Sequence, residues 1–192
     1  MKTRIRLLKE IYLNEGIHQR ELARKLDIGM PSVTNAIKGA KNLLKRKQQG
    51  RILRYYLNYS SKNIIPYIYL IEYSRLDELP KNTQYSVYDL LKSLKNKPVL
   101  TIIFGSYAKG NYSKSSDLDI LLVFNKKVKE PESKAKIISS RYNISISPVY
   151  LDFETFSEGF FNQKKKFFQD LKKNKIIISG VEWWVELKNE ET

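Results

Sequence analysis

The residues best suited to chemistry lie between positions 105 and 119. Gly105 and Ser106 follow the β-rich run PVLTIIF, residues 98–104, and after a spacer of 10 residues Asp117 and Asp119 open a second apolar run, DLDILLVF. Glycine lets backbone N–H groups approach an anion closely, and the serine hydroxyl adds a further donor. The turn at Gly105 is therefore predicted to hold a triphosphate.

Asp117 and Asp119 have the spacing expected of ligands to a divalent cation. Residues two apart in an extended segment point the same way, so both carboxylates should face one side of the sheet edge. Two aspartates this close repel each other unless a divalent cation lies between them. A third ligand is expected from a neighbouring strand. Asp152, at the end of the run ISISPVYLD, is the first candidate and Glu154 is a weaker one.

The composition restricts the kind of metal site. The chain of 192 residues has no cysteine and one histidine, His18, which is expected in a turn. Oxygen ligands alone remain, and these favour Mg²⁺ or Mn²⁺. The first ten residues are charged throughout, and no run of about 18 apolar residues occurs, so we expect no membrane span and a cytoplasmic location.

The site needs a sheet and helices to position it, and the apolar pattern predicts both. Apolar residues at helical spacing favour helices over about residues 66–79, 85–94 and 154–173. The β-rich runs around the Gly-Ser turn and the Asp pair predict strands, and another short apolar strand precedes Gly180. The expected fold class is α+β.

Positive charge is concentrated near the N-terminus. The chain holds 35 Lys and Arg against 20 Asp and Glu, a net charge of +15, and residues 1–58 alone hold 14 basic and 4 acidic residues. A polyanion is the natural partner of such a segment. The competing interpretation is a lysine-rich composition that reflects genome bias or a hot habitat.

The same segment predicts three short helices followed by a basic hairpin. The third helix begins near Pro31 and carries short polar groups first and lysines later, an order that suits base edges and then phosphates. The candidate DNA-binding residues of this helix and the hairpin are Ser32, Thr34, Asn35, Lys38, Lys41, Lys45, Arg51 and Arg54.

The stretch IHQRELARKLDIGMPSVTNAIKGAKNLLKRK gives residues 1–58 a resemblance to the winged helix-turn-helix family. The resemblance implies a recognition helix from Pro31 to about Lys47, a wing around Gln48–Arg54, and DNA binding as a homodimer. The alternatives are a small helical domain with a solvated basic face and a winged helix used only for dimerisation.

The Gly-Ser pair, the spacer and the Asp-x-Asp together resemble the nucleotidyltransferases related to DNA polymerase beta, in particular the minimal nucleotidyltransferases. The resemblance covers about residues 82–185 and implies a mixed sheet flanked by helices. It also implies two Mg²⁺ ions bound by Asp117 and Asp119, with Asp152 completing the site beside the attacking hydroxyl. The nucleotide-binding residues implied by the resemblance are Gly105, Ser106, Lys109 and Ser116, although an arginine is common where Lys109 stands.

The implied reaction is transfer of a nucleoside monophosphate, with ATP as the donor, to a hydroxyl acceptor such as a protein side chain. Small nucleotidyltransferases of this branch resemble antitoxins that modify a tyrosine of a partner toxin, so a separate toxin protein is an expected partner. We expect a DNA-binding domain over residues 1–58, a helical linker over 59–81 and a nucleotidyltransferase domain over 82–192. The alternatives are a transcriptional regulator that only senses nucleotide and an RNA-modifying transferase.

Overall fold

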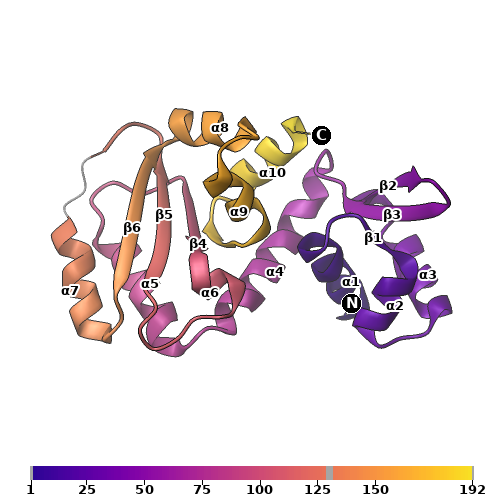
Figure 1. Ribbon diagram of the computed structural model, residues 1–192, viewed down its shortest axis with the longest axis horizontal. Helices are drawn as coiled ribbons and strands as arrows, with labels where there is room; N and C mark the ends of the chain where they lie inside the picture. The colour runs from indigo at the N-terminus through magenta and orange to yellow at the C-terminus, as the bar shows by residue number, and fades with distance from the viewer. Residues whose placement is uncertain (1, 129–131, 192) are drawn as a thin grey trace. The chain divides into compact units, whose positions relative to one another are not determined.

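The computed structural model describes residues 2–128 and 132–191 (Figure 1). The chain divides into two compact units, Met1–Ile71 and Glu72–Thr192, and the division falls inside helix α4, Ile65–Asp77. This boundary lies within the stretch that was expected to link the two domains. Among the described residues, no helix combines the length and the apolar composition needed to cross a membrane.

The N-terminal unit consists of short helices and a small antiparallel sheet. The strands lie in the order β1-β3-β2, with Ile17 opposite Tyr55 and Lys47 opposite Arg54. Leu7, Leu8, Ile11, Leu22 and Leu57 are among the fully buried side chains. The elements before α4 are α1 (Lys2–Leu13), β1 (Ile17–His18), α2 (Gln19–Leu26), α3 (Met30–Gly39), a 3₁₀ turn (Lys41–Leu43), β2 (Leu44–Gln49), β3 (Ile52–Leu57) and a second 3₁₀ turn (Lys62–Ile64).

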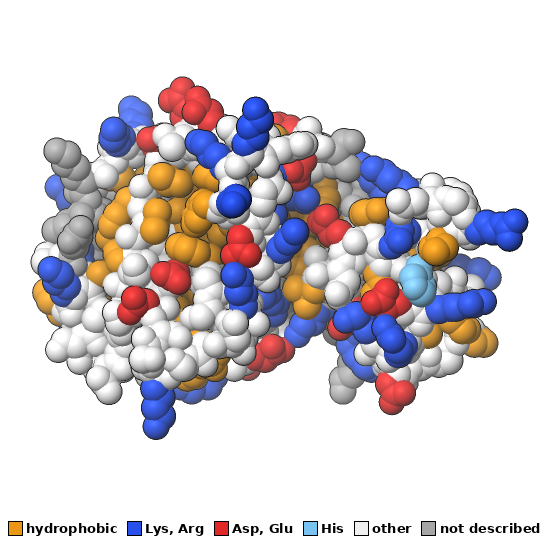
Figure 2. Space-filling view, in the orientation of Figure 1, with side chains coloured by type: hydrophobic (Ala, Val, Ile, Leu, Met, Phe, Trp, Pro, Cys, Tyr) orange, Lys and Arg blue, Asp and Glu red, His pale blue; other side chains and the backbone are white. Residues whose placement is uncertain are grey.

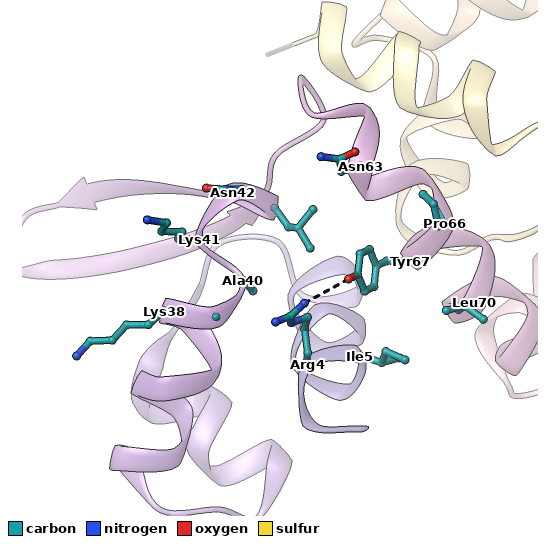
Figure 3. A pocket seen from close by; sticks show the side chains of 12 residues that line it. Arg4, Ile5, Lys38, Ala40, Lys41, Asn42, Asn63, Pro66, Tyr67 and Leu70 are labelled. Carbon is teal, nitrogen blue, oxygen red and sulfur yellow. Dashed lines mark hydrogen bonds between the residues drawn. The ribbon is translucent and has the colours of Figure 1, made fainter. Parts of the chain in front are cut away.

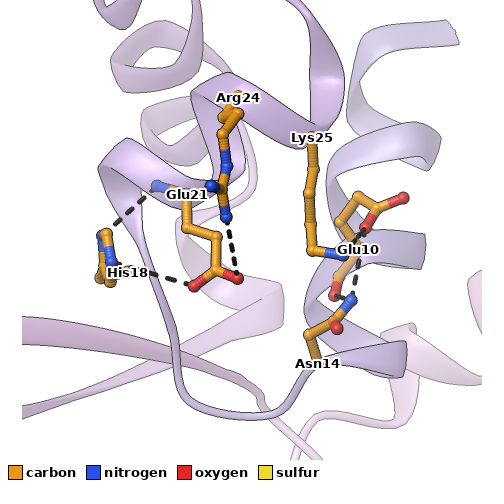
Figure 4. Close-up of polar contacts among 6 residues, drawn as sticks. All are labelled: Glu10, Asn14, His18, Glu21, Arg24 and Lys25. Atoms are coloured by element: carbon orange, nitrogen blue, oxygen red, sulfur yellow. Dashed lines mark hydrogen bonds and ion pairs between the residues drawn. The ribbon is translucent and has the colours of Figure 1, made fainter.

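Helix α2 begins at a cap formed by the single histidine (Figure 4). His18 Nδ1 accepts a hydrogen bond from the backbone N–H of Glu21 at 3.3 Å. The Glu21 carboxylate lies 3.8 Å from Arg24, and Lys25 lies 3.9 Å from Glu10 of α1. His18 therefore has the structural role expected of a residue in the turn before a helix.

The third helix of this unit is shorter than the winged-helix resemblance implies. Helix α3 ends at Gly39, whereas the resemblance implied a recognition helix to about Lys47. The residues from Leu44 onward instead form β2 and pair along their length with β3. Cross-strand hydrogen bonds thus compete successfully with helix propensity, and the basic residues of this stretch lie on a hairpin.

The C-terminal unit contains a mixed sheet covered by helices, as expected. The described strands lie in the order β6-β5-β4-β7; β5 and β6 are parallel, and the other neighbours are antiparallel. The elements after α4 are α5 (Lys81–Ser93), β4 (Leu100–Phe104), α6 (Gly105–Lys109), β5 (Leu118–Phe124), α7 (Glu132–Tyr142), β6 (Ile146–Asp152), α8 (Phe153–Phe161), α9 (Lys166–Lys173), β7 (Ile176–Ser179) and α10 (Val181–Glu190).

The alternation of side chains along β5 divides the unit into two apolar layers. Leu118, Ile120, Leu122 and Phe124 face a core that α5 and α7 complete. On the other side, aromatic residues of α8, α9 and α10 pack together, with Phe160 and Trp184 in edge-to-face contact at 5.2 Å between ring centroids. Both faces of β5 are buried, so the strand holds Asp119, near its N-terminal end, in a fixed position.

The predicted helix over residues 154–173 is two helices in the structure. Helix α8 ends at Phe161, and α9 begins at Lys166. In the break, the Asn162 side chain accepts a hydrogen bond from the backbone N–H of Lys164 at 2.9 Å, a local bond that competes with a continuous helix. The break lets Phe168 return to pack against Phe156 at 5.7 Å between ring centroids.

Candidate active site

Asp119 and the Gly-Ser turn meet at the point where β4 and β5 pair. Phe104, the last residue of β4, lies opposite Asp119, and helix α6 starts at the next residue, Gly105. Gly105 has a φ of +68°, and a Cβ atom built on it would lie 2.1 Å from Oδ2 of Asp119. Only glycine fits this backbone, so the carboxylate lies directly against the turn.

The charge of Asp117 acts on Asp119. Asp119 is half-buried, and Asp117, just before the strand, is exposed. Burial raises the pKa of the Asp119 carboxyl, and the neighbouring charge of Asp117 raises this pKa further. The two residues are separated by one position at the start of β5, so their charges repel each other. A divalent cation between them would remove this repulsion.

The structure corrects the predicted position of Asp152. Strands β5 and β6 are parallel, with Asp119 opposite Ser147 and Phe124 opposite Asp152. Asp152 is thus five residues further along β6 than the position beside Asp119, about 16 Å at about 3.3 Å per residue. In parallel strands the C-terminal end of one strand lies far from the N-terminal end of its neighbour. Asp152, at the C-terminal end of β6, is therefore distant from Asp119, near the N-terminal end of β5, and its sequence-based assignment as a third ligand and catalytic residue is wrong.

Asp152 has a different role in the structure. Its Oδ1 accepts a hydrogen bond from the backbone N–H of Thr155 at 2.7 Å and so caps helix α8. Hydrogen bonding to Thr155 lowers the pKa of the Asp152 carboxyl. Glu154, the weaker candidate, lies in the first turn of the same helix and so at the same distant edge.

Two other predicted nucleotide-binding residues have partners within the protein. Lys109 of α6 forms an ion pair with Asp170 of α9, with 2.9 Å between Nζ and Oδ2, and this contact lowers the pKa of the Asp170 carboxyl. The Ser116 hydroxyl accepts a hydrogen bond from the backbone N–H of Ser113 at 2.9 Å. Ser116 thus orders the loop that leads into Asp117, and a phosphate would have to compete with Asp170 for Lys109.

Sequence reasoning did not identify Arg75, which ties helix α4 to the turn. Its guanidinium donates to the backbone carbonyl of Ala108 in α6 at 3.1 Å and to that of Lys175 beside β7. It also forms an ion pair with Glu72, a residue only 1% exposed, at 3.1 Å. Arg75 lies 30 residues before Gly105, and no local pattern around it indicates these contacts.

The site as a whole fits one divalent cation. Asp117 and Asp119 supply two carboxylates at one sheet edge, and Mg²⁺ commonly uses one or two carboxylates with water and substrate phosphates as the remaining ligands. No group of three or more acidic, histidine or cysteine side chains able to hold a metal occurs in residues 2–128 and 132–191. The three-carboxylate arrangement expected from the sequence is therefore not formed by the described residues.

Some candidate DNA-binding side chains are exposed, and others form hydrogen bonds within the protein or are half-buried. Thr34 is engaged because its hydroxyl accepts from Gln19 at 2.6 Å and donates to the Met30 carbonyl at 2.9 Å. Arg54 donates to the Gly16 carbonyl at 2.8 Å, which joins β3 to the chain before β1. Lys45 is half-buried on β2. The exposed candidates are Ser32, Asn35, Lys38, Lys41 and Arg51.

A surface pocket of about 630 Å³ lies beside the end of α3 in the N-terminal unit (Figure 3). Arg4 of α1 points into it and donates to the Tyr67 hydroxyl of α4 at 3.5 Å. The Lys38 side chain extends away from these two residues (Figure 3). Lysine and arginine side chains are spread over the surface of this unit (Figure 2). Lys38 lines the pocket as well, but its side chain is exposed and available to a ligand outside it.

Comparison with known proteins gives the C-terminal unit a family. The family model described as "Nucleotidyltransferase domain" matches residues 87–182, half of the chain. A protein from Methanocaldococcus jannaschii, provisionally named a protein adenylyltransferase, is 40% identical over 67 residues, which cover 32% of this chain and 67% of that protein.

A crystal structure of a provisionally named nucleotidyltransferase from Sulfolobus solfataricus is also similar. It shares 23% identity and a TM-score of 0.32, over 55% of this chain and 84% of that chain.

The region matched by the family model, residues 87–182, contains the glycine turn, the Asp pair and strands β4 and β5. The chain therefore belongs to the nucleotidyltransferase domain family.

Proposed function

We propose that this protein transfers a nucleoside monophosphate from a nucleoside triphosphate to a hydroxyl group on another protein, with ATP as the donor. The observation that carries the proposal is the contact of the Asp119 carboxylate with the backbone at Gly105, beside the charge of Asp117. Protein side chains as acceptors and ATP as donor are supported by the name of the M. jannaschii relative.

The residues of the site divide the work of this reaction. The Gly105-Ser106 turn presents backbone N–H groups and a hydroxyl to the phosphates. Asp117 and Asp119 would hold a divalent cation, which supplies positive charge to the phosphate oxygens when bound. The acceptor hydroxyl oxygen forms a bond to the α-phosphorus, the α–β phosphoanhydride bond breaks, and pyrophosphate leaves. The hydroxyl proton passes to solvent or to a base on the acceptor.

The test uses a matched pair of aspartate substitutions. Purified protein is incubated with Mg²⁺, ATP labelled at the α-phosphate and candidate acceptor proteins, including any neighbouring toxin protein. Asp119→Asn should abolish label transfer. Asp152→Asn, the same chemical change at the opposite sheet edge, should retain it because asparagine also caps helices well. Equal loss in both variants would contradict the proposed site.

The alternative function is a regulator that binds nucleotide without transferring it. The Lys109–Asp170 ion pair occupies a cation that the phosphates would use in either function, so transfer itself has to be measured to separate the two. Binding of labelled ATP by the wild-type protein without transfer to any acceptor, and loss of that binding in Asp119→Asn, would support the regulator.

We also propose that the N-terminal unit binds duplex DNA as a winged helix. The order of its helices and strands, its three-stranded antiparallel sheet and the exposed Ser32, Asn35 and Lys38 on α3 support this proposal. Binding should weaken steeply with salt because contacts between lysine and phosphate release counterions. Titration of duplex DNA and of structured RNA at two salt concentrations would test it, and a preference for RNA would favour the RNA-modifying alternative.

A further inference from the structure

The positions beside the carboxylate pair, one on strand β6 and one just before it, carry hydroxyl groups. Ser147 is the register partner of Asp119, and register partners on neighbouring strands point to the same face of a sheet. Two residues earlier, the Ser145 carbonyl accepts a hydrogen bond from the N–H of Leu118 at 2.7 Å, which places Ser145 next to Asp117. A neutral side chain therefore occupies each position from which β6 could add a ligand.

The nearby acids that are described do not replace the missing carboxylate. Asp152 lies at the other sheet edge and caps α8. Asp170 is paired with Lys109 and also accepts a hydrogen bond from the Asn174 side chain at 2.9 Å. A carboxylate held by a lysine and an amide is a poor candidate for a cation ligand, because binding the cation would break both contacts.

Charge balance shows what two carboxylates can hold. Two ionised aspartates neutralise one divalent cation, and the triphosphate supplies negative charge on the nucleotide side only, so a second cation beside the acceptor hydroxyl would need a further carboxylate from the protein. Catalytic cations in two-metal sites lie about 3.5–4 Å apart, so a second one here would face the first with no further carboxylate from the described residues. At such a separation the repulsion between two divalent charges is large unless acidic ligands offset it.

We propose that this active site binds a single divalent cation, shared with the nucleotide, and that Ser147 occupies the position where a second cation would need a carboxylate. The proposal rests on the proposed nucleotidyl transfer. In this arrangement no second metal ion held by the described residues activates the acceptor hydroxyl.

The experiment counts Mn²⁺ ions by equilibrium dialysis. The protein is mixed with an equimolar ATP analogue in which a methylene group replaces the α,β-bridging oxygen, and bound ions per chain are measured at saturation. The wild type should bind one ion. Ser147→Asp should bind two, whereas Ser147→Asn, which has the same size without the charge, should bind one.

Several results would overturn the inference, and they differ from failure of the proposed function. Two ions in the wild type would overturn it, and Asp152→Asn or Asp170→Asn would then identify the ligand by reducing the count to one. One ion in a folded Ser147→Asp variant would also overturn it. If Ser147→Asp does not fold, the wild-type count decides. One bound ion without transfer to any acceptor would refute the proposed function and leave the single-ion site standing.

Discussion

Gly105→Ala tests the contact on which the active site depends. The left-handed backbone at φ +68° costs an L-residue about 1–2 kcal/mol, a loss that should appear in the free energy of unfolding. The new Cβ would lie 2.1 Å from Asp119 Oδ2, whereas real Cβ contacts essentially never fall below 3.0 Å. The carboxylate must therefore move by about 0.9 Å, the difference between these two distances. A misplacement of about 1 Å at a catalytic group can reduce the rate on the order of 100-fold.

Gly110→Ala is the matched control. Gly110 has a similar φ, +75°, and ends the same short helix, but a Cβ there would have nothing within 4 Å. Both variants should lose a similar amount of stability, and only Gly105→Ala should lose transfer. Urea denaturation followed by tryptophan fluorescence reports on the C-terminal unit alone, because both tryptophans, Trp183 and Trp184, lie on α10.

Transfer is measured with labelled ATP in buffer without urea, where both variants are folded. The reasoning is refuted if Gly105→Ala transfers label as fast as Gly110→Ala at equal folded fractions, because the position of the Asp119 carboxylate would then not matter. It is also refuted if both glycine variants lose transfer equally, since backbone strain in α6 rather than the contact with Asp119 would explain the loss.

Three further predictions concern charge. Because burial and then the charge of Asp117 raise the pKa of the Asp119 carboxyl, its ionised form destabilises the metal-free protein. Asp119→Asn should therefore raise the urea midpoint at neutral pH. The gain should shrink as the pH falls below the raised pKa and disappear below the ordinary pKa of aspartate, where the carboxyl is protonated in both the folded and the unfolded state. Arg75→Met should destabilise the C-terminal unit by about 3–5 kcal/mol, because it removes an ion-pair partner of the buried Glu72 together with the hydrogen bonds to the Ala108 and Lys175 carbonyls; a change under about 1 kcal/mol would contradict this. Lys38→Glu should weaken DNA binding and reduce its salt dependence, measured by fluorescence anisotropy, and unchanged affinity would exclude α3 as the docking helix.

Local patterns predicted the elements that neighbouring residues decide. The sequence pattern predicted three short helices at the N-terminus, and the structure has α1, α2 and α3 there. The prediction failed where residues far apart in the sequence determine the structure. Leu44–Gln49 were expected to be partly helical, but they form β2 and pair with β3. Helix α7 was not predicted, and its low amphipathic contrast gives the sequence little signal.

The same distinction explains the candidate site. Gly105, Ser106, Asp117 and Asp119 lie within a stretch of 15 residues, at the start of α6 and around the start of β5, so their spacing alone brings them close together. Arg54 was expected to contact DNA from the wing, but its Gly16 partner is 38 residues away and only the folded sheet shows it. Arg54→Glu would break this contact, so it is a poor test of DNA binding.

The direction of β6 decides how many ligands the site has. A β-rich run ending in an aspartate has the same sequence signature whether the strand runs parallel or antiparallel to β5. In an antiparallel pair the end of β6 would meet the start of β5, and Asp152 would join Asp117 and Asp119. Helix α7 makes the connection a crossover, so β6 runs parallel to β5 and brings Ser147 to that position instead. The number of carboxylates at the site therefore depends on the connection between two strands, and a substitution such as Ser147→Asp adds a carboxylate there without changing that connection.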